Sequence, residues 1–335
     1  MISGDELSQA VTVAIGLVIL VLVLAAANAG DQSAIWRTVA YAGMIGLCTI
    51  VALLAMAGIS NAVTVPGAVA ASGVSATRVV LGNLLELVGA LGAPLFLVPW
   101  TRRQLARLLH TFRPESTINA VAASMYILVL IYLVSSQVSV DQLRALKQSG
   151  ATPALWLNIA TNQLPFLVVA IAGVGLFVRR SIPETLQRLG LYWPGWRWIA
   201  GSAVVAVLLV VFGVFFDAMM TRLTPDVSSS INDISQRLFS SITNPAAALA
   251  VALAAGVGEE VLFRGALQPR LGIVAAALLF AVLHTQYAIS LASVEIFILG
   301  LALGWLRKRA GVTGAIIAHA GYDLILLMIP FVVHK

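Results

Sequence analysis

Charged residues are scarce in this chain of 335 residues, and what is missing already restricts its class. Asp, Glu, Lys and Arg make up 10% of the residues, hydrophobic residues make up 60%, and the mean hydropathy is +0.98. This composition excludes an ordinary soluble globular protein, in which about a quarter of the residues are charged. Cys48 is the only cysteine, which excludes disulfides within the chain and zinc sites built from several cysteines.

Long apolar runs take the place of the missing charges. Runs of about 18 to 22 residues are long enough to cross the ~30 Å hydrocarbon layer as helices. Lipid offers no partners for backbone groups, so a helix, which satisfies its own backbone, is expected in each run. The alternating ten-residue pattern of an outer-membrane barrel does not occur. We therefore predict an all-α, polytopic integral membrane helical bundle with about ten transmembrane helices. The expected spans are 10–30, 38–60, 79–100, 117–138, 163–178, 199–220, 247–268, 272–290, 293–306 and 313–333.

The positive charges concentrate in every second loop between these spans. The odd-numbered loops contain RTVA, TRRQLARLLHTFRPES, RRSIPETLQRLGLYWPGWRW, RGALQPRLG and RKRAG, which hold 14 of the 20 Lys and Arg residues. The positive-inside rule then places these loops in the cytoplasm and both termini outside. Attraction to anionic lipid headgroups explains the net charge of +6, so no nucleic-acid partner is expected.

Two basic loops also contain helix signals. In TRRQLARLLHTFRP the leucines follow helical spacing and the arginines fall elsewhere, which predicts a basic interfacial helix. Ser181 and Glu184 have the spacing of a capping box at the start of another short helix. These loops suggest no chemistry, and we divide the chain into an unassigned region of six spans, 1–246, and a segment of four spans, 247–333.

Ionisable residues within the spans are functional candidates, because each costs at least ~2.5 kcal/mol at the centre of a bilayer. Glu86, Asp217 and Glu295 are isolated, and a structural or interfacial role is expected for each. The last four spans are different because six such residues accumulate there. They are Glu259, Glu260, Arg264, His284, His319 and Asp323.

Helix geometry separates the two adjacent glutamates. Glu260 lies four residues before Arg264, which is the favoured order for an ion pair on one helix face. Glu259 is rotated by ~100° and faces other surroundings. One carboxylate is thus expected to be neutralised locally and the other to be free, although a purely structural salt bridge with a spare glutamate is the alternative.

The remaining candidates are expected at similar depth. At ~1.5 Å per residue, Glu259 lies ~14 Å from the cytoplasmic end of its span, His284 ~18 Å, His319 ~10 Å and Asp323 ~15 Å. His319 and Asp323 are four residues apart on one face. Three spans therefore bring carboxylates and histidines to one level of the membrane.

Such a set of side chains has two catalytic uses. A carboxylate and a histidine deprotonate a water while a second histidine stabilises an oxyanion. Alternatively, Glu259, His284 and His319 hold a divalent metal such as zinc with a position left for water. No HExxH motif occurs, and the motifs of other intramembrane proteases are incomplete. A non-catalytic scaffold, immunity protein or transporter would use the same buried charges for structure or ion binding.

Three motifs on successive spans carry a resemblance to a known family. EEVLFR fits EExxxR, FAVLH fits FxxxH, and HAGYD fits HxxxN/D. In order and spacing they resemble the CAAX prenyl protease and bacteriocin-processing (CPBP) family of intramembrane proteases, over about 247–333. The resemblance implies that Glu259 activates water beside His284, and that Glu260 and Arg264 organise the site. It also implies that His319 and Asp323 stabilise the oxyanion or complete a metal site, and that Phe280 packs in the pocket.

One position departs from the pattern of the eukaryotic prenyl-processing members, which have Asn where this chain has Asp323. An ionised Asp cannot donate a hydrogen bond to an oxyanion, so Asp323 would be protonated, orient His319 or bind metal. The resemblance implies an intramembrane peptidase of metallo or glutamate type, with the lipid bilayer and a membrane-associated peptide or protein substrate as partners. We expect a bacterial inner-membrane protein whose active site faces the cytoplasm.

Overall fold

The architecture of the chain is helical throughout. The computed structural model describes residues 4–66, 75–137, 158, 160–287 and 289–333. Within these ranges the regular elements are helices, apart from one isolated β-bridge between Leu176 and Arg180. Seven helical segments of the described residues are long and apolar enough to cross a membrane. The predicted all-α polytopic bundle is confirmed, whereas the count of ten spans is not.

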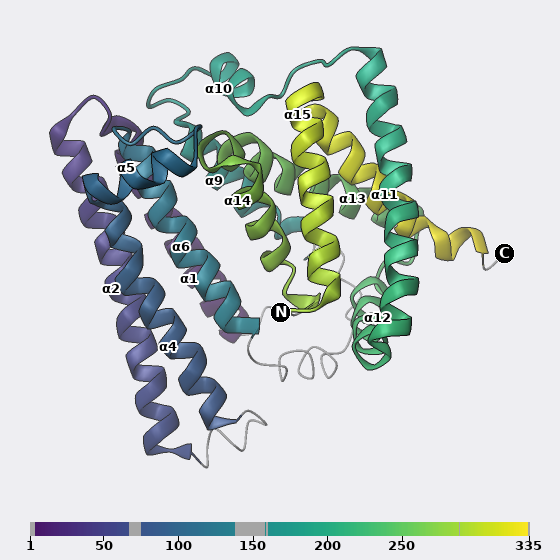
Figure 1. Ribbon diagram of the computed structural model, residues 1–335, viewed down its shortest axis with the longest axis horizontal. Helices are drawn as coiled ribbons and strands as arrows, with labels where there is room; N and C mark the ends of the chain where they lie inside the picture. Colours follow the sequence, from purple (N-terminus) through teal and green to yellow (C-terminus); the bar gives the residue numbers. More distant parts are fainter. Residues whose placement is uncertain (1–3, 67–74, 138–157, 159, 288, 334–335) are drawn as a thin grey trace.

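The N-terminal helices α1 (Gly4–Ala29), α2 (Ala34–Thr64), α4 (Ala76–Gly92) and α6 (Thr117–Gln137) form one group, at the left of Figure 1. Their shared core contains many small side chains, including Ala27 and Ala40, which are fully buried beside Met44. Small residues let helix backbones approach closely in lipid, where apolar contact alone gives little drive to associate. The buried Asn28 then joins this group to α9 (Leu164–Val174), because its Nδ2 donates to the Ala172 carbonyl at 3.0 Å.

The expected fifth span is shorter than predicted. Within 163–178 the helix α9 has 11 residues and ends at Gly175, whose φ of 86° suits a residue without a Cβ. At 1.5 Å per residue, 11 residues extend only ~17 Å, about half of the hydrocarbon layer. α9 is therefore an apolar helix held among the others and does not cross the membrane alone.

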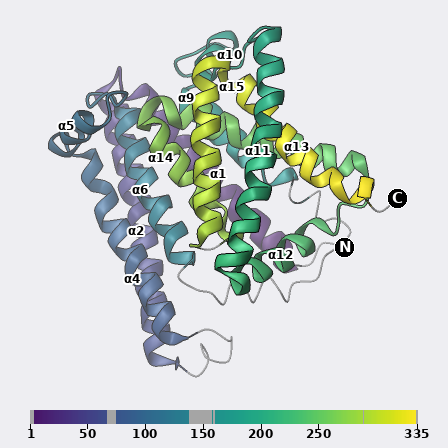
Figure 2. The ribbon, with the colours of Figure 1, turned by 45° about the vertical axis from the view of Figure 1, so that its right-hand side comes forward.

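The C-terminal helices enclose the candidate residues. They are α11 (Trp196–Leu223), α13 (Pro245–Glu260), the π-helix η2 (Val261–Leu267), α14 (Gln268–Leu283) and α15 (Leu291–Val333). Their core combines aromatic residues with leucines, among them Phe263, Phe280 and Leu303, each at most 2% exposed. Figures 1 and 2 both show α11 running alongside α15.

Two glycines break the long helical segments where loops were expected. Gly272 has a φ of 86° and Gly311 a φ of 69°, a region that strongly favours glycine. The segments 245–283 and 291–332 each count once as a candidate span, although each bends at its glycine. At the second break, the Val312 backbone N–H donates to the Gly190 carbonyl at 2.8 Å. Gly190 has positive φ itself and ends the short helix α10 (Ile182–Leu189).

A glycine also sets the spacing between α13 and α15. A Cβ placed on Gly256 would lie 2.9 Å from the Cβ of Ala320 and 3.0 Å from its backbone nitrogen. Only glycine allows this approach, which is typical of small-residue contacts between membrane helices. Because Gly256 precedes the two glutamates by one turn and Ala320 follows His319, the contact brings the glutamate and histidine segments together.

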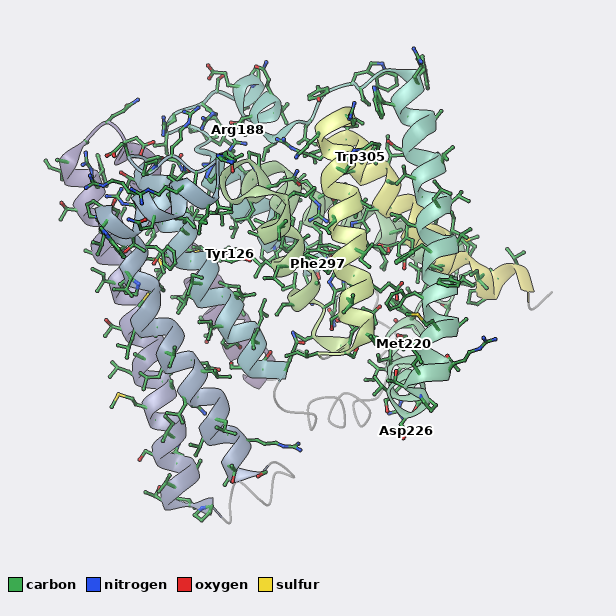
Figure 3. The ribbon with its side chains drawn as sticks, viewed as in Figure 1. Tyr126, Arg188, Met220, Asp226, Phe297 and Trp305 are labelled. Atoms are coloured by element: carbon green, nitrogen blue, oxygen red, sulfur yellow. The ribbon has the colours of Figure 1, made fainter. Side chains whose placement is uncertain are left out.

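The two ends of the molecule differ in charge. The end that carries α5 (Pro99–Leu108) and α10 is named the basic end, and the end that carries α12 (Pro225–Phe239) and η3 (Thr285–Tyr287) is named the α12 end. Figure 3 shows Arg188 at the first and Asp226 at the second. The predicted capping box of Ser181 and Glu184 is confirmed at the start of α10, and a helix forms within the predicted interfacial segment.

Candidate active site among the C-terminal helices

Glu260 is the centre of a buried charged cluster. Its Oε2 lies 3.2 Å from Arg264 Nε, both side chains are 0% exposed, and its Oε1 lies 2.9 Å from His319 Nδ1. The predicted pairing of Glu260 with Arg264 is therefore present. The Arg264 guanidinium lies over the Phe280 ring, with Cζ 4.6 Å from the centroid, which adds a cation–π attraction. Since a charge in such surroundings needs partners, the cluster holds the end of α13 and the start of η2 against α15.

His319 is held between two carboxylates. Its Nδ1 faces Glu260, and its Nε2 lies 3.5 Å from Asp323 Oδ2, one turn further along α15. A neutral imidazole donates from one nitrogen only, so donation to both carboxylates requires the ring protonated on both nitrogens. The arrangement therefore orients the ring and provides a donor beside Asp323.

Glu259 is placed differently from Glu260. It is 7% exposed, and its Oε1 accepts a hydrogen bond from Gln163 Nε2 at 3.3 Å. Its Oε2 has no hydrogen-bond partner among the described residues. A buried carboxylate oxygen without a partner is an available acceptor for a proton. The predicted contrast between the two glutamates is thus visible in their surroundings.

His284 ends α14, and its tautomer follows from one contact. Nδ1 lies 2.8 Å from the Phe280 carbonyl oxygen, one turn earlier. A carbonyl oxygen only accepts, so this hydrogen bond exists when Nδ1 carries the proton, and Nε2 of the neutral ring then carries the lone pair. The ring also packs against Phe280, with centroids 4.8 Å apart, and stacks on Tyr287.

One cavity brings the candidate residues together. It has a volume of about 1000 Å³, and Glu259, His284, His319 and Asp323 all lie in its wall, as does Phe280. Glu260 and Arg264 do not line it and lie behind the wall. Much of the remaining lining is apolar, from helices α11, α12, α13 and α15. Four ionisable side chains on three predicted spans thus share one largely apolar chamber.

The π-helix η2 follows immediately after the two glutamates. Its seven residues, Val261–Leu267, contain Arg264 and the buried Phe263. Single π turns are rare in helices and are frequent at functional sites. Here the wider turn lies against α10, because a Cβ on Gly265 would lie 3.0 Å from Leu189 Cδ2.

The expected metal ligands do not form a ligand group in this arrangement. Among the described residues no three His, Cys, Asp or Glu side chains converge as a metal site requires. Both ring nitrogens of His319 face carboxylates, so neither is directed at a position shared with Glu259 and His284. The donors present do not fit a bound metal, and no chemical step is assigned to one.

The cavity lies away from the basic end of the molecule. Its exposed rim includes Asn162 before α9, and Gln236 and Ser240 of the α12 region. α9 reaches the basic end at Val174, beside Arg180, so its beginning points away from that end. The cavity therefore lies toward the α12 end. The sequence predicts both cytoplasmic basic loops and an active site that faces the cytoplasm, and the side of the membrane on which the cavity opens stays a prediction.

Sequence reasoning missed two residues of the site. Gln163, the partner of Glu259, is an amide at the start of a short apolar helix, and no motif or spacing marks it. Tyr287 was not singled out either, although it follows His284 by three residues and stacks on it. Burial raises the pKa of Tyr287 to about 12, with smaller contributions from Glu295 and Asp323. Its phenol is thus a neutral hydrogen-bond donor on the cavity wall.

Comparison with known families adds an independent result. Residues 241–325 match the family described as type II CAAX prenyl endopeptidase Rce1-like. This segment, which we name the Rce1-like segment, is similar to that family. The predicted resemblance to the CPBP proteases is confirmed, and the Rce1-like segment contains all six candidate residues. It covers about a quarter of the chain. Comparisons with curated proteins and with solved structures gave no match.

Proposed function

We propose that this integral membrane protein is an intramembrane endopeptidase that cleaves a peptide bond with an activated water. The observation that carries the proposal is the shared cavity, in which Glu259 and His284 offer acceptors while His319 and Asp323 offer oriented polar groups. The Rce1-like segment supports the reaction class, because its family is described as endopeptidases. A cavity of about 1000 Å³ also lies at the upper end of the ~300–1,000 Å³ typical of ligand sites.

In the proposed reaction, Glu259 takes a proton from water as the water oxygen attacks the carbonyl carbon of the scissile peptide. His284, with its lone pair on Nε2, shares this role from α14. The developing oxyanion receives a hydrogen bond from the neutral Tyr287, and the positive charge of a protonated His319, which Glu260 and Asp323 orient, stabilises it electrostatically. As the carbon–nitrogen bond breaks, the proton held by Glu259 passes to the leaving amine. Glu260 and Arg264 act as positioning residues behind the cavity wall.

The substrate class follows from where the cavity lies. Most of its apolar lining belongs to helices long and apolar enough to span a membrane, which favours a membrane-associated peptide or protein over a soluble one. A bacterial inner-membrane setting remains our proposal. The test compares membrane peptides from cells that carry the wild type, Glu259→Gln or Glu86→Gln at equal protein levels. Glu86 is a matched control, because it lies on another helix and accepts from Ser135 at 2.8 Å.

A cleaved species is expected with the wild type and with Glu86→Gln, and not with Glu259→Gln. Unchanged peptides and an unchanged cellular phenotype with Glu259→Gln would indicate a scaffold, immunity protein or transporter and would overturn the proposal.

For orientation, we propose that the basic end faces the cytoplasm and that the cavity opens on the other side. Single cysteines at Lys308 on the basic end and at Ser240 on the cavity rim, both exposed, report the two sides once Cys48 is replaced by Ala. A membrane-impermeant maleimide added to spheroplasts is expected to label Ser240→Cys and to spare Lys308→Cys. The reverse pattern would place the cavity in the cytoplasm.

A further inference from the structure

A second cavity, at the basic end, is lined by an unusual number of arginines. It has a volume of about 660 Å³ and lies apart from the candidate active site, with which it shares no lining residue. Six guanidinium groups reach it from five separate stretches of the chain. They belong to Arg113, Arg179, Arg180, Arg188, Arg270 and Arg307.

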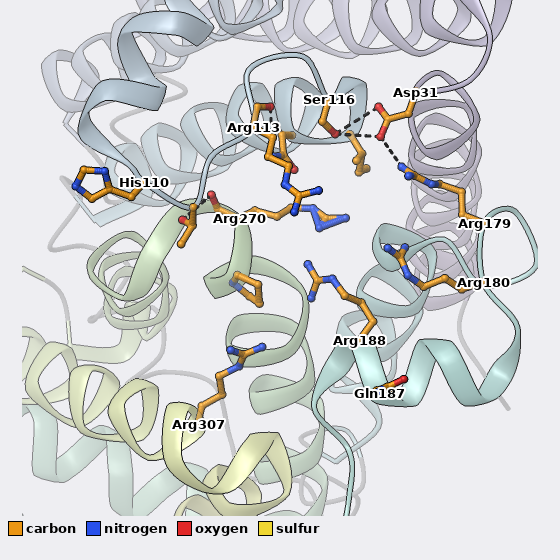
Figure 4. A pocket seen from close by; sticks show the side chains of 14 residues that line it. Asp31, His110, Arg113, Ser116, Arg179, Arg180, Gln187, Arg188, Arg270 and Arg307 are labelled. Atoms are coloured by element: carbon orange, nitrogen blue, oxygen red, sulfur yellow. Dashed lines mark hydrogen bonds and ion pairs between the residues drawn. The ribbon is translucent and has the colours of Figure 1, made fainter.

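One carboxylate lines this cavity within the described part of the chain, and it is already engaged. Asp31 forms an ion pair with Arg179, accepts from the Thr117 backbone N–H at 2.6 Å and accepts from the Ser116 hydroxyl. Figure 4 shows Asp31 at one edge of the cavity, with Arg113, Arg188 and Arg270 directed toward its middle. Among the described residues, most of the positive charge in the cavity therefore has no anionic partner in its lining.

Several of these guanidinium groups are held in place by neutral backbone carbonyls. Arg270 Nη2 donates to the Gly173 carbonyl at 2.9 Å, Arg188 Nη1 donates to the Gly265 carbonyl at 3.1 Å, and Arg180 donates to the Val174 carbonyl. Arg270 is only 8% exposed, and the Nε of Arg307 is buried without a hydrogen-bond partner. Carbonyls orient a guanidinium without neutralising it, so the cavity is a fixed cluster of cations.

The charges in the cavity repel one another. Burial, together with the neighbouring charges of Arg180, Arg307 and Arg113, lowers the pKa of Arg188 to about 10. Burial also lowers the pKa of Arg180, with Arg179 as the next cause. Arginine side chains stay protonated at neutral pH, and an anion between these two would relieve the repulsion.

Membrane topology alone does not account for this arrangement. Lys and Arg that serve only the positive-inside rule face the headgroups from the outer surface, as the exposed Arg103, Arg107, Lys308 and Arg309 do. The six arginines instead converge on one enclosed space. Planar guanidinium groups bind phosphate oxygens in pairs, and several around one space favour a group with two or more negative charges.

We propose that this arginine cavity is a binding site for a phosphate-bearing anion, either the phosphomonoester headgroup of a membrane lipid or a free phosphate such as pyrophosphate. Its position at the end of the helices allows access from the headgroup layer and from water. The site is also connected to the candidate active site, because Arg188 contacts Gly265 within the π-helix that carries Arg264. The proposal concerns binding and is independent of the proposed protease activity.

The test measures binding to the purified full-length protein in zwitterionic detergent. One arm adds pyrophosphate, and the other adds mixed micelles that contain phosphatidic acid, phosphatidylglycerol or phosphatidylcholine. The double variant Arg113→Gln/Arg307→Gln removes two cavity charges that form no ion pair among the described residues. The double variant Arg103→Gln/Arg107→Gln removes the same charge from the exposed surface and is the matched control.

Saturable binding to the wild type is expected, weakened at least tenfold by the cavity variant and less than twofold by the control. Salt should weaken it as well, because the attraction is between charges. Binding of pyrophosphate identifies a free anion, and binding of phosphatidic acid without pyrophosphate identifies a lipid headgroup. The proposal is overturned if neither binds, or if both double variants weaken binding equally, since general surface attraction would then suffice. Thermal unfolding of both variants verifies that they are folded.

Discussion

Exchanging each of the two adjacent glutamates for glutamine should produce opposite phenotypes, although the two changes are chemically identical. Glu260 and Arg264 are both 0% exposed, so Glu260→Gln leaves a guanidinium enclosed without its counter-charge. Removing one partner of a buried pair costs about 3–5 kcal/mol. Glu259→Gln keeps the side-chain volume, and Gln163 still has an amide oxygen to donate to. Its effect on stability should stay below about 1 kcal/mol.

Thermal unfolding and peptide cleavage separate the two variants. At about 2–4 °C per kcal/mol for domains of 150–250 residues, Glu260→Gln should lower the melting temperature by on the order of 10 °C. Glu259→Gln should melt close to the wild type, yet lose about 10²-fold to 10⁴-fold in cleavage rate if Glu259 is the general base. The melting temperatures and cleavage rates of both variants are measured in the same detergent. The substrate is the species whose cleavage was identified in cells.

A third variant verifies the assigned cause. Glu260→Gln/Arg264→Met removes both charges, so it should recover part of the stability lost by Glu260→Gln alone. Equal melting temperatures for the two single glutamine variants would refute the reasoning. If the stability lost by the double variant equals or exceeds the sum of the losses in Glu260→Gln and Arg264→Met alone, Glu260 and Arg264 are not coupled as described.

Three further outcomes are expected. If Asp323 serves by orienting His319, Asp323→Asn should keep substantial activity and Asp323→Ala should lose it. This expectation is contradicted if the active wild type contains a stoichiometric metal and the Asp323→Asn variant loses both the metal and its activity. Gly256→Ala should cost about 1–3 kcal/mol and lower activity, because its Cβ would press on Ala320, whereas Gly16→Ala, with nothing within 4 Å, is the neutral control in melting experiments. Gln163→Leu should lower the cleavage rate with little change in melting temperature, and an unchanged rate would remove Gln163 from the site.

Much of the fold could be predicted because the bilayer imposes strong constraints. The apolar runs predicted helices correctly, and the pairing of Glu260 with Arg264 followed from their spacing of four residues. The number of spans could not be derived in the same way. Hydropathy does not reveal that a positive-φ glycine such as Gly311 joins two runs into one bent helix, or that α9 is short because Gly175 ends it.

The wall of the site was harder to predict than its motifs. Helical periodicity aligns residues within one span, as for His319 and Asp323, but the contact of Gln163 with Glu259 joins residues 96 positions apart. The π-helix also escaped prediction, because its sequence, VLFRGAL, has no signal that separates it from an α-helix. The side on which the cavity opens depends on how helix ends pack, and loop charges do not report this.

The hydrogen bond between Val312 and Gly190 lies at the bend of α15, next to Gly311. His319 lies eight residues beyond Gly311, which is ~12 Å along the helix at 1.5 Å per residue. A tilt of about 10° at that glycine would therefore displace the imidazole by ~2 Å, enough to break its 2.9 Å contact with Glu260. The short helix α10, which ends at Gly190 and contributes no residue to the candidate active site, thus helps to hold the angle at which His319 meets it. Substitutions at Gly190 would therefore misalign His319 in the candidate active site, although Gly190 itself lies outside that site.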